Sequence, residues 1–199
     1  MGQIYVALYG SKSRSNMSDL ITGTELIRLL TSMPVETVDS LYNIYCTPQK
    51  EEEYDNCYKT SIDELIRLSS LDEVLQMLDF TDSYIENGGH NMTTLAEAIK
   101  NKTPIIQECM IRCAAGIDEF IGTSASRSSN AYCLHELQLE MAKSAVENEV
   151  IDVVGDAMVS MIGVPGVDAA GALVLAGYDL YSSLEMAHKY NMCCATHVS

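Results

Sequence analysis

Positive charge is scarce in this sequence. Its 199 residues include 12 Lys and Arg side chains against 28 Asp and Glu, which gives a formal net charge of -16 at pH 7. Such a charge repels nucleic-acid phosphates and anionic membrane surfaces at long range. The densest basic group is Lys-Ser-Arg at residues 12–14. We therefore expect an acidic protein that binds neither nucleic acid nor membranes.

A signal peptide is not predicted, because the start, MGQIYVALYG, has no charged region before its apolar residues. The number of cysteines is odd, which argues for free thiols in a reducing compartment rather than a disulfide framework. They are Cys46, Cys57, Cys109, Cys113, Cys133, Cys193 and Cys194. We expect a cytoplasmic protein.

No motif identifies a catalytic residue. The sequence contains no Gly-x-Ser-x-Gly motif of a nucleophilic serine. None of its four histidines lies in a motif that would identify it as a general base. Whether the chain is an enzyme, which residues would be catalytic and which cofactor it would use all stay unassigned.

Metal motifs are missing as well. No Cys-x-x-Cys pairs have zinc spacing, so the cysteines are expected to be small buried side chains and no metal site is predicted. Cys193 and Cys194, close to His197, leave two further readings open, metal binding or oxidation.

The N-terminal half alternates strand patterns with helix patterns. Strands are predicted at residues 4–9, 35–45 and 80–85, and helices at 18–30, 60–78 and 93–99, with a break at Ser69-Ser70. This alternation is typical of a parallel sheet. We predict an α/β fold with a small, mostly parallel, Rossmann or flavodoxin-like sheet in residues 1–107.

From residue 108 on, helices are predicted, with a serine-rich loop at 122–130. Residues 145–192 form the longest apolar part, but Val164 to Asp168 interrupt it, which favours two buried helices over a membrane span. Residues 150–154 fit a strand or a helix. Residues 108–199 are predicted to be a helical region packed on the α/β domain, or part of one continuous domain.

Small residues mark one face of the last apolar helix. Ala169, Ala172 and Ala176 recur at i, i+3 and i+7, so another backbone can approach them closely. The helix at 166–184 is therefore either a central core helix or the interface of a homo-oligomer. The second reading supports a structural or regulatory protein with no catalytic centre.

Carboxylates stand out in the same apolar surroundings. Asp152, Asp156, Asp168 and Asp179 lie where an unpaired charge would be costly. Helix capping is an equally good explanation for Asp168.

A polar loop follows the first predicted strand. It contains Gly10, Ser11, Lys12, Ser13, Arg14 and Ser15. In a parallel sheet such a loop meets the N-terminus of the next helix, where an anion is favoured. The loop resembles the phosphate loop of flavodoxin-like FMN reductases, a Gly-Ser-x-x-Arg-x-x-Asn-like pattern, and this resemblance implies phosphate binding. A solvated polar turn is the alternative.

A second loop would complete the pocket. Gly88, Gly89 and Thr93 stand between a predicted strand and a predicted helix, at the same edge of the sheet. Glycines there would let a ligand approach the backbone, although an ordinary turn also fits. We therefore expect the chain to bind a phosphate-bearing, nucleotide-like small molecule.

Overall fold

The computed structural model describes residues 23–121, 131–162 and 167–197, without the side chains of residues 23–24, 162 and 167–177. The described residues form helices and contain no strand. They are α2 (Gly23–Ser32), α3 (Val35–Tyr45), α4 (Pro48–Leu68), α5 (Leu71–Glu86), α6 (Met92–Ile99), α7 (Pro104–Ile121), α8 (Ala131–Ile162) and α9 (Val167–Thr196). The prediction of an α/β fold is wrong.

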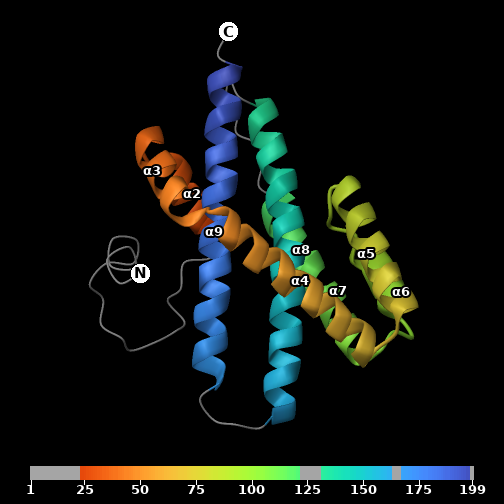
Figure 1. The fold of residues 1–199 in the computed structure, drawn as a ribbon. Helices are drawn as coiled ribbons and strands as arrows, with labels where there is room; N and C mark the ends of the chain where they lie inside the picture. Colours follow the sequence, from red (N-terminus) through yellow and green to blue (C-terminus); the bar gives the residue numbers. More distant parts are fainter. Residues whose placement is uncertain (1–22, 122–130, 163–166, 198–199) are drawn as a thin grey trace.

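Two long helices form the centre of the molecule. α8 has 32 residues and α9 has 30, and they run antiparallel side by side (Figure 1). At about 1.5 Å per residue each is roughly 45 Å long. α4 crosses in front of both, α7 packs on α8, α2 and α3 pack on α9, and α5 and α6 lie on the outside of α7.

The strand predicted at residues 35–45 is helix α3. Its β-branched and aromatic composition suggested a strand. However, Val38, Leu41 and Tyr45 also recur at helical spacing, and together they pack against α2 and against Leu184 of α9. Packing of this apolar face makes the segment helical even though its residue types favour a strand, since tertiary packing commonly overrides β-propensity.

Two other segments are helical for the same reason. The strand predicted at 80–85 continues α5, where Met77, Thr81 and Tyr84 are buried along one side. Residues 150–154, which fitted either class, belong to α8, and Val150 and Val153 are fully buried between the packed helices.

Polar caps set several helix boundaries. The predicted break at Ser69-Ser70 is confirmed, because the Ser70 hydroxyl accepts a hydrogen bond from the Glu73 amide at 3.2 Å and begins α5. Asn91 caps α6, and its Oδ1 accepts a hydrogen bond from the Thr94 amide at 3.0 Å. Such caps satisfy amides that the first helical turn leaves without a partner.

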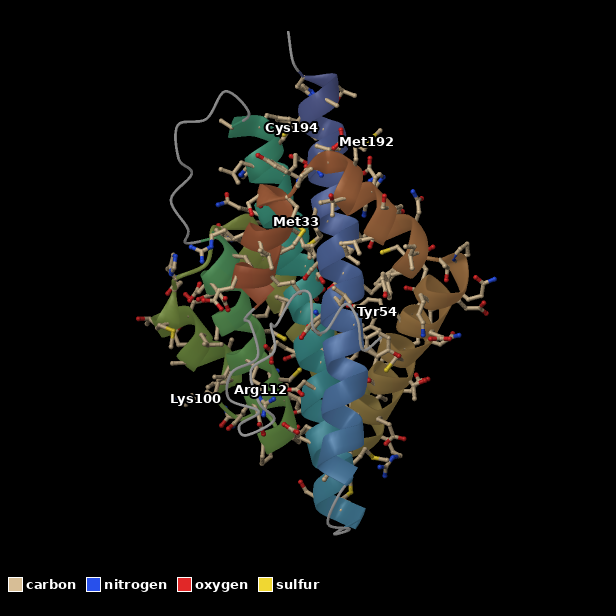
Figure 2. The ribbon with its side chains drawn as sticks, turned by 90° about the vertical axis from the view of Figure 1, so that its left-hand side faces the viewer. Met33, Tyr54, Lys100, Arg112, Met192 and Cys194 are labelled. Carbon is tan, nitrogen blue, oxygen red and sulfur yellow. A yellow bond between two sulfur atoms is a disulfide. The ribbon has the colours of Figure 1, made fainter. Side chains whose placement is uncertain are left out.

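The core is divided by the central pair. The largest buried cluster joins α4, α5, α6, α7 and α8, and α2, α3 and α9 form a second one. A third contact lies where α4 crosses α9 and includes Tyr54, which is labelled in Figure 2. The Tyr54 ring packs on Tyr178 and Tyr181, with ring centroids 5.2 and 5.8 Å away.

Several predictions concern residues outside the described part. They include the strand at 4–9, the loop at 10–15 and the loop at 122–130. Ala169, Ala172 and Ala176 belong to α9, but their side chains are not described, so self-association through this helix stays a prediction. The division near residue 108, which lies within α7, also stays a prediction. In the described residues, no helix has the length and apolarity needed to cross a membrane.

Candidate functional site

The paired glycines form a turn between two helices. Gly88 and Gly89 have φ angles of +77° and +69°, and their amides donate to carbonyl oxygens at the end of α5. This left-handed backbone ends the helix, a common use of glycine. Thr93 lies exposed in the first turn of α6.

Asp118 of α7 holds this turn in place. Its Oδ1 accepts a hydrogen bond from the His90 amide at 2.7 Å, and its Oδ2 accepts one from the Tyr84 hydroxyl at 3.2 Å. A Cβ atom on Gly89 would stand 2.4 Å from that Oδ1. The described residues contain no strand before this turn, so the phosphate site predicted at a sheet edge is wrong, and the glycines serve the α5–α6 connection.

A cavity of about 160 Å³ lies between α7, α8 and α9. Its polar lining consists of Glu119, Ser144, Asn148, Glu149, Asp179, Ser182 and Ser183. None of the described residues that line it is positively charged. The cavity therefore gathers acidic and hydroxyl groups between the longest helices of the molecule.

Asp179 is the most perturbed carboxylate of the cavity. Burial, and next the charge of Asp152, raise its pKa to about 6. The side chain is nevertheless solvent-accessible, which is consistent with a carboxylate that faces a water-reachable cavity while protein surrounds it. Its charge is therefore poorly solvated, and the neutral form is favoured relative to a carboxylate in water.

Glu149 lies in the same lining on α8. Burial raises its pKa, and the charge of Asp152 adds to this rise while Arg112 opposes it. The cavity thus holds at least two carboxylates for which a positively charged ligand would supply missing stabilisation.

A chain of hydrogen bonds leads into the cavity from α4. The buried Tyr54 hydroxyl donates to Asn148 Oδ1 at 3.0 Å, and Asn148 Nδ2 donates to Asp179 Oδ1 at 3.2 Å. The first bond fixes the orientation of the Asn148 amide, because only its oxygen can accept from the phenol. Asp179 is therefore positioned by a side chain that is itself held in place.

The serine hydroxyls differ in how they are bonded. Ser182 Oγ donates to the Tyr178 carbonyl oxygen at 3.0 Å. Ser144 Oγ is buried, and its interaction with the Tyr54 hydroxyl opposes, in part, the rise that burial causes in the pKa of the phenol. Ser144 therefore belongs to the buried polar groups around Tyr54.

The remaining wall of the cavity is apolar. It consists of Ile27, Gly116, Phe120, Met141, Ala145 and Met186. Gly116 brings α7 and α8 close together, since a Cβ atom there would stand 3.1 Å from the Ala145 Cβ. The combination of a few polar groups with an apolar wall is usual in small-molecule sites.

Sequence reasoning missed this cavity, although it singled out Asp179. The lining residues come from four helices and are separated by up to about 160 positions in the chain. The only local signal was a carboxylate in apolar surroundings.

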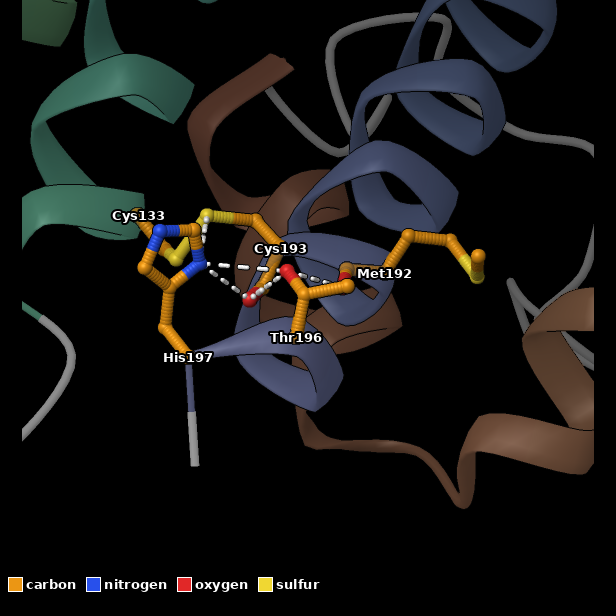
Figure 3. Close-up of a disulfide and its surroundings, with 5 residues drawn as sticks. All are labelled: Cys133, Met192, Cys193, Thr196 and His197. Carbon is orange, nitrogen blue, oxygen red and sulfur yellow. Dashed lines mark hydrogen bonds between the residues drawn. A yellow bond between two sulfur atoms is a disulfide. The ribbon is translucent and has the colours of Figure 1, made fainter. Parts of the chain in front are cut away.

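A second group of reactive side chains lies at the far ends of α8 and α9. Cys133 and Cys193 form a disulfide, so the expectation that all cysteines are free is wrong for these two. The imidazole of His197 lies beside their sulfur atoms (Figure 3). Cys46, Cys57, Cys109, Cys113 and Cys194 are free thiols.

Comparison of the chain with protein family models, with curated proteins and with solved structures finds no match.

Proposed function

We propose that the chain binds a small organic cation, a primary ammonium on a short apolar group, in the cavity between α7, α8 and α9. The observation that carries this proposal is the pairing of Glu149 and Asp179 in a lining whose described residues include no positive charge. The raised pKa values of Glu149 and Asp179 show that their surroundings disfavour the anionic forms. An ammonium ion beside them would stabilise these anions.

The size of the cavity limits the ligand. A cavity of about 160 Å³ is similar to the engineered cavity of about 150 Å³ that holds benzene, a ligand of six heavy atoms. The ligand is therefore a short-chain or single-ring amine, much smaller than a nucleotide.

The arrangement of the carboxylates favours an organic cation over a metal ion. A bound metal needs several ligand atoms close together. Among the described residues, the only three Cys, His, Asp or Glu side chains with ligand atoms within 4.8 Å of one another are Cys133, Cys193 and His197, outside the cavity. An ammonium group donates three hydrogen bonds that can reach acceptors spaced more widely.

The other lining groups fit the same ligand. Asp179 and Glu149 offer acceptors for the N–H groups, whereas Phe120, Met141 and Met186 offer apolar contact for the carbon chain. A primary ammonium with an alkyl group uses both kinds of surface.

Isothermal titration calorimetry with n-butylammonium chloride tests the proposal. We expect one site per chain, and no binding of neutral n-butanol at the same concentration. Asp179→Asn and Glu149→Gln should each weaken binding about 10-fold or more, since a hydrogen bond to a charged group contributes about 1.5–3 kcal/mol.

Asp63→Asn is the matched control. Asp63 is exposed on α4 and does not line the cavity, so its loss should leave the affinity unchanged. Equal affinity for butylammonium and butanol, or equal weakening by all three substitutions, would show that the cavity is not a cation site.

For the location, we propose the cytoplasm. The five free thiols support a reducing compartment, where such groups persist. Alkylation of thiols at the moment of cell lysis, followed by mass spectrometry, tests this, because modification of few or none of the cysteines would contradict it.

A further inference from the structure

The ends of α8 and α9 bring two sulfur atoms and an imidazole together. Cys133 stands in the first turn of α8, and Cys193 and His197 stand at the end of α9. The ligand atoms of these three side chains all lie within 4.8 Å of one another. Figure 3 shows the His197 ring next to both sulfur atoms, so the cluster is already assembled while the disulfide is present.

Helix geometry explains this meeting. Cys193 and His197 are four residues apart, so they lie on the same side of the end of α9, and Cys193 Sγ is 3.8 Å from His197 Nδ1. The antiparallel packing of α8 against α9 brings Cys133 to that side, with 5.7 Å between the Cα atoms of the two cysteines.

We propose that the reduced protein binds a zinc ion through Cys133, Cys193 and His197, and that oxidation of the two thiolates to the disulfide releases it. Two cysteines and a histidine are a common set of zinc ligands, which leaves the fourth tetrahedral position for water or substrate. The disulfide between Cys133 and Cys193 is then the oxidised form of this site.

The distances suit a tetrahedral ion. With Zn–S near 2.3 Å and Zn–N near 2.0–2.1 Å, a tetrahedral angle places a sulfur and a nitrogen ligand about 3.6 Å apart. The Cys193 and His197 atoms are 3.8 Å apart now. After reduction, the two sulfurs need to separate to about 3.8 Å, which rotation of side chains on fixed helices can provide.

The histidine also changes role between the two states. His197 Nδ1 now lies 3.0 Å from the Cys193 carbonyl oxygen, so this nitrogen carries the ring proton and donates it there. Zinc binding at Nδ1 requires the tautomer with the proton on Nε2. The disulfide and the metal therefore compete for the sulfur atoms of Cys133 and Cys193, and zinc binding also requires the other tautomer of His197.

The oxidation is balanced when a low-molecular-weight disulfide such as glutathione disulfide is the oxidant. One protein thiolate attacks a sulfur of glutathione disulfide, forms a mixed disulfide and releases one glutathione thiolate. The second protein thiolate attacks the mixed disulfide, forms the Cys133–Cys193 bond and releases the second glutathione. The protein loses two electrons, glutathione gains them, and zinc leaves with the loss of its two sulfur ligands.

Other cysteine pairs lack this arrangement. Cys109 and Cys113 also stand one turn apart, but both are buried in the core, where the Cys109 thiol and burial raise the pKa of Cys113. Cys194 follows Cys193 directly, yet its thiol lies against the Tyr190 hydroxyl. Burial, and next the Cys194 thiol, raise the pKa of Tyr190. Cys194 is therefore a matched control for its neighbour.

Metal titration of the full chain in a phosphine reductant tests the proposal, with zinc and a chromophoric competing chelator. We expect one zinc ion per chain. Cys133→Ser, Cys193→Ser and His197→Ala should each weaken zinc binding more than about 100-fold, since even groups that only support a metal ligand commonly cost 10–100-fold. Cys194→Ser should retain the wild-type affinity.

Cobalt(II) provides a test that needs no substitution. Bound to the reduced wild-type protein, it should give thiolate-to-cobalt charge-transfer absorption, which oxidised protein lacks. Adding glutathione disulfide to the zinc form should release one zinc ion and two glutathione molecules per chain. A folded, reduced wild-type protein without stoichiometric metal binding, or binding that survives His197→Ala or is lost in Cys194→Ser, would overturn the assignment.

Discussion

The His188 imidazole of α9 and the Asp39 carboxylate of α3 are joined, with Nδ1 2.8 Å from Oδ1. The Tyr42 ring stacks on the imidazole, with centroids 4.1 Å apart and planes 11° from parallel. Together with the apolar cluster of Val38 and Leu184, this contact holds α3 on the central pair of helices.

Removal of this imidazole should destabilise the protein. We expect His188→Ala to lower the free energy of unfolding by about 1–2 kcal/mol, since a hydrogen bond and an aromatic contact are lost together. Urea unfolding followed by circular dichroism measures this change. His135, an exposed histidine of α8, is the control, and His135→Ala should change stability by less than about 0.5 kcal/mol.

The two glycines of the α5–α6 turn should respond differently to alanine. Both have positive φ, which costs an alanine about 1–2 kcal/mol. At Gly88 a Cβ atom meets nothing within 4 Å, whereas at Gly89 it would collide with Asp118. We therefore expect Gly89→Ala to cost at least about 1 kcal/mol more than Gly88→Ala in chemical unfolding. Equal losses would mean that Asp118 moves aside at no cost.

Arg112 holds three carboxylates together between α7 and α8. Figure 2 labels this side chain. Its Nη1 pairs with Asp152, and its Nη2 lies 2.8 Å from Asp156 and 2.9 Å from Glu108. Arg112→Met should lower the free energy of unfolding by about 1–2 kcal/mol, because the carboxylates then repel one another.

Added salt should restore part of that loss by screening the repulsion. The control is Arg67→Met, which removes an exposed pair with Glu64 on α4 and should change stability by less than about 0.5 kcal/mol. Unfolding curves at low and high sodium chloride concentration distinguish the two variants, and an Arg112 variant insensitive to salt would contradict this account.

Asp179 should make stability depend on pH. Its folded pKa of about 6 is above the unfolded value of 3.8, so the folded state holds this proton more tightly than the unfolded chain does. The resulting stabilisation is complete below about pH 4 and is lost as the pH rises through 6.

At pH 7 the ionised side chain is therefore a cost, and Asp179→Asn should raise stability there by about 1 kcal/mol or less, because solvent still reaches the carboxylate. Melting temperatures of wild type and variant between pH 4 and 8 measure this. The gain of the variant over wild type should grow with pH, and a gain independent of pH would exclude Asp179 as its source.

Local sequence patterns predicted some of the fold correctly. The apolar spacing around Leu65 and Val74 identified helices on both sides of the Ser69-Ser70 break, and the weakly charged C-terminal run was correctly interpreted as two helices. These features depend on residues within about one or two turns of each other.

The class of the fold could not be read in the same way. Segments such as residues 35–45 contain valine, isoleucine and tyrosine, which are favoured in strands, but their apolar residues also fit helical spacing. Packing against α2 and α9 decides between the two. The disulfide and the cavity could not be predicted from local sequence patterns, because their residues are far apart in the chain. Cys133 and Cys193 are 60 residues apart in sequence, and their proximity follows from how α8 packs on α9.

That disulfide also changes how the chain is connected. In the oxidised protein, the backbone from residue 133 to residue 193 and the sulfur bridge form a closed ring that contains most of α8 and α9. One peptide bond hydrolysed anywhere inside this ring opens it without dividing the molecule, so the cut protein keeps its mass apart from one added water. The same cut in the reduced protein gives two polypeptides that only packing holds together. The redox state of this cysteine pair thus determines whether a single proteolytic cut divides the chain into two polypeptides.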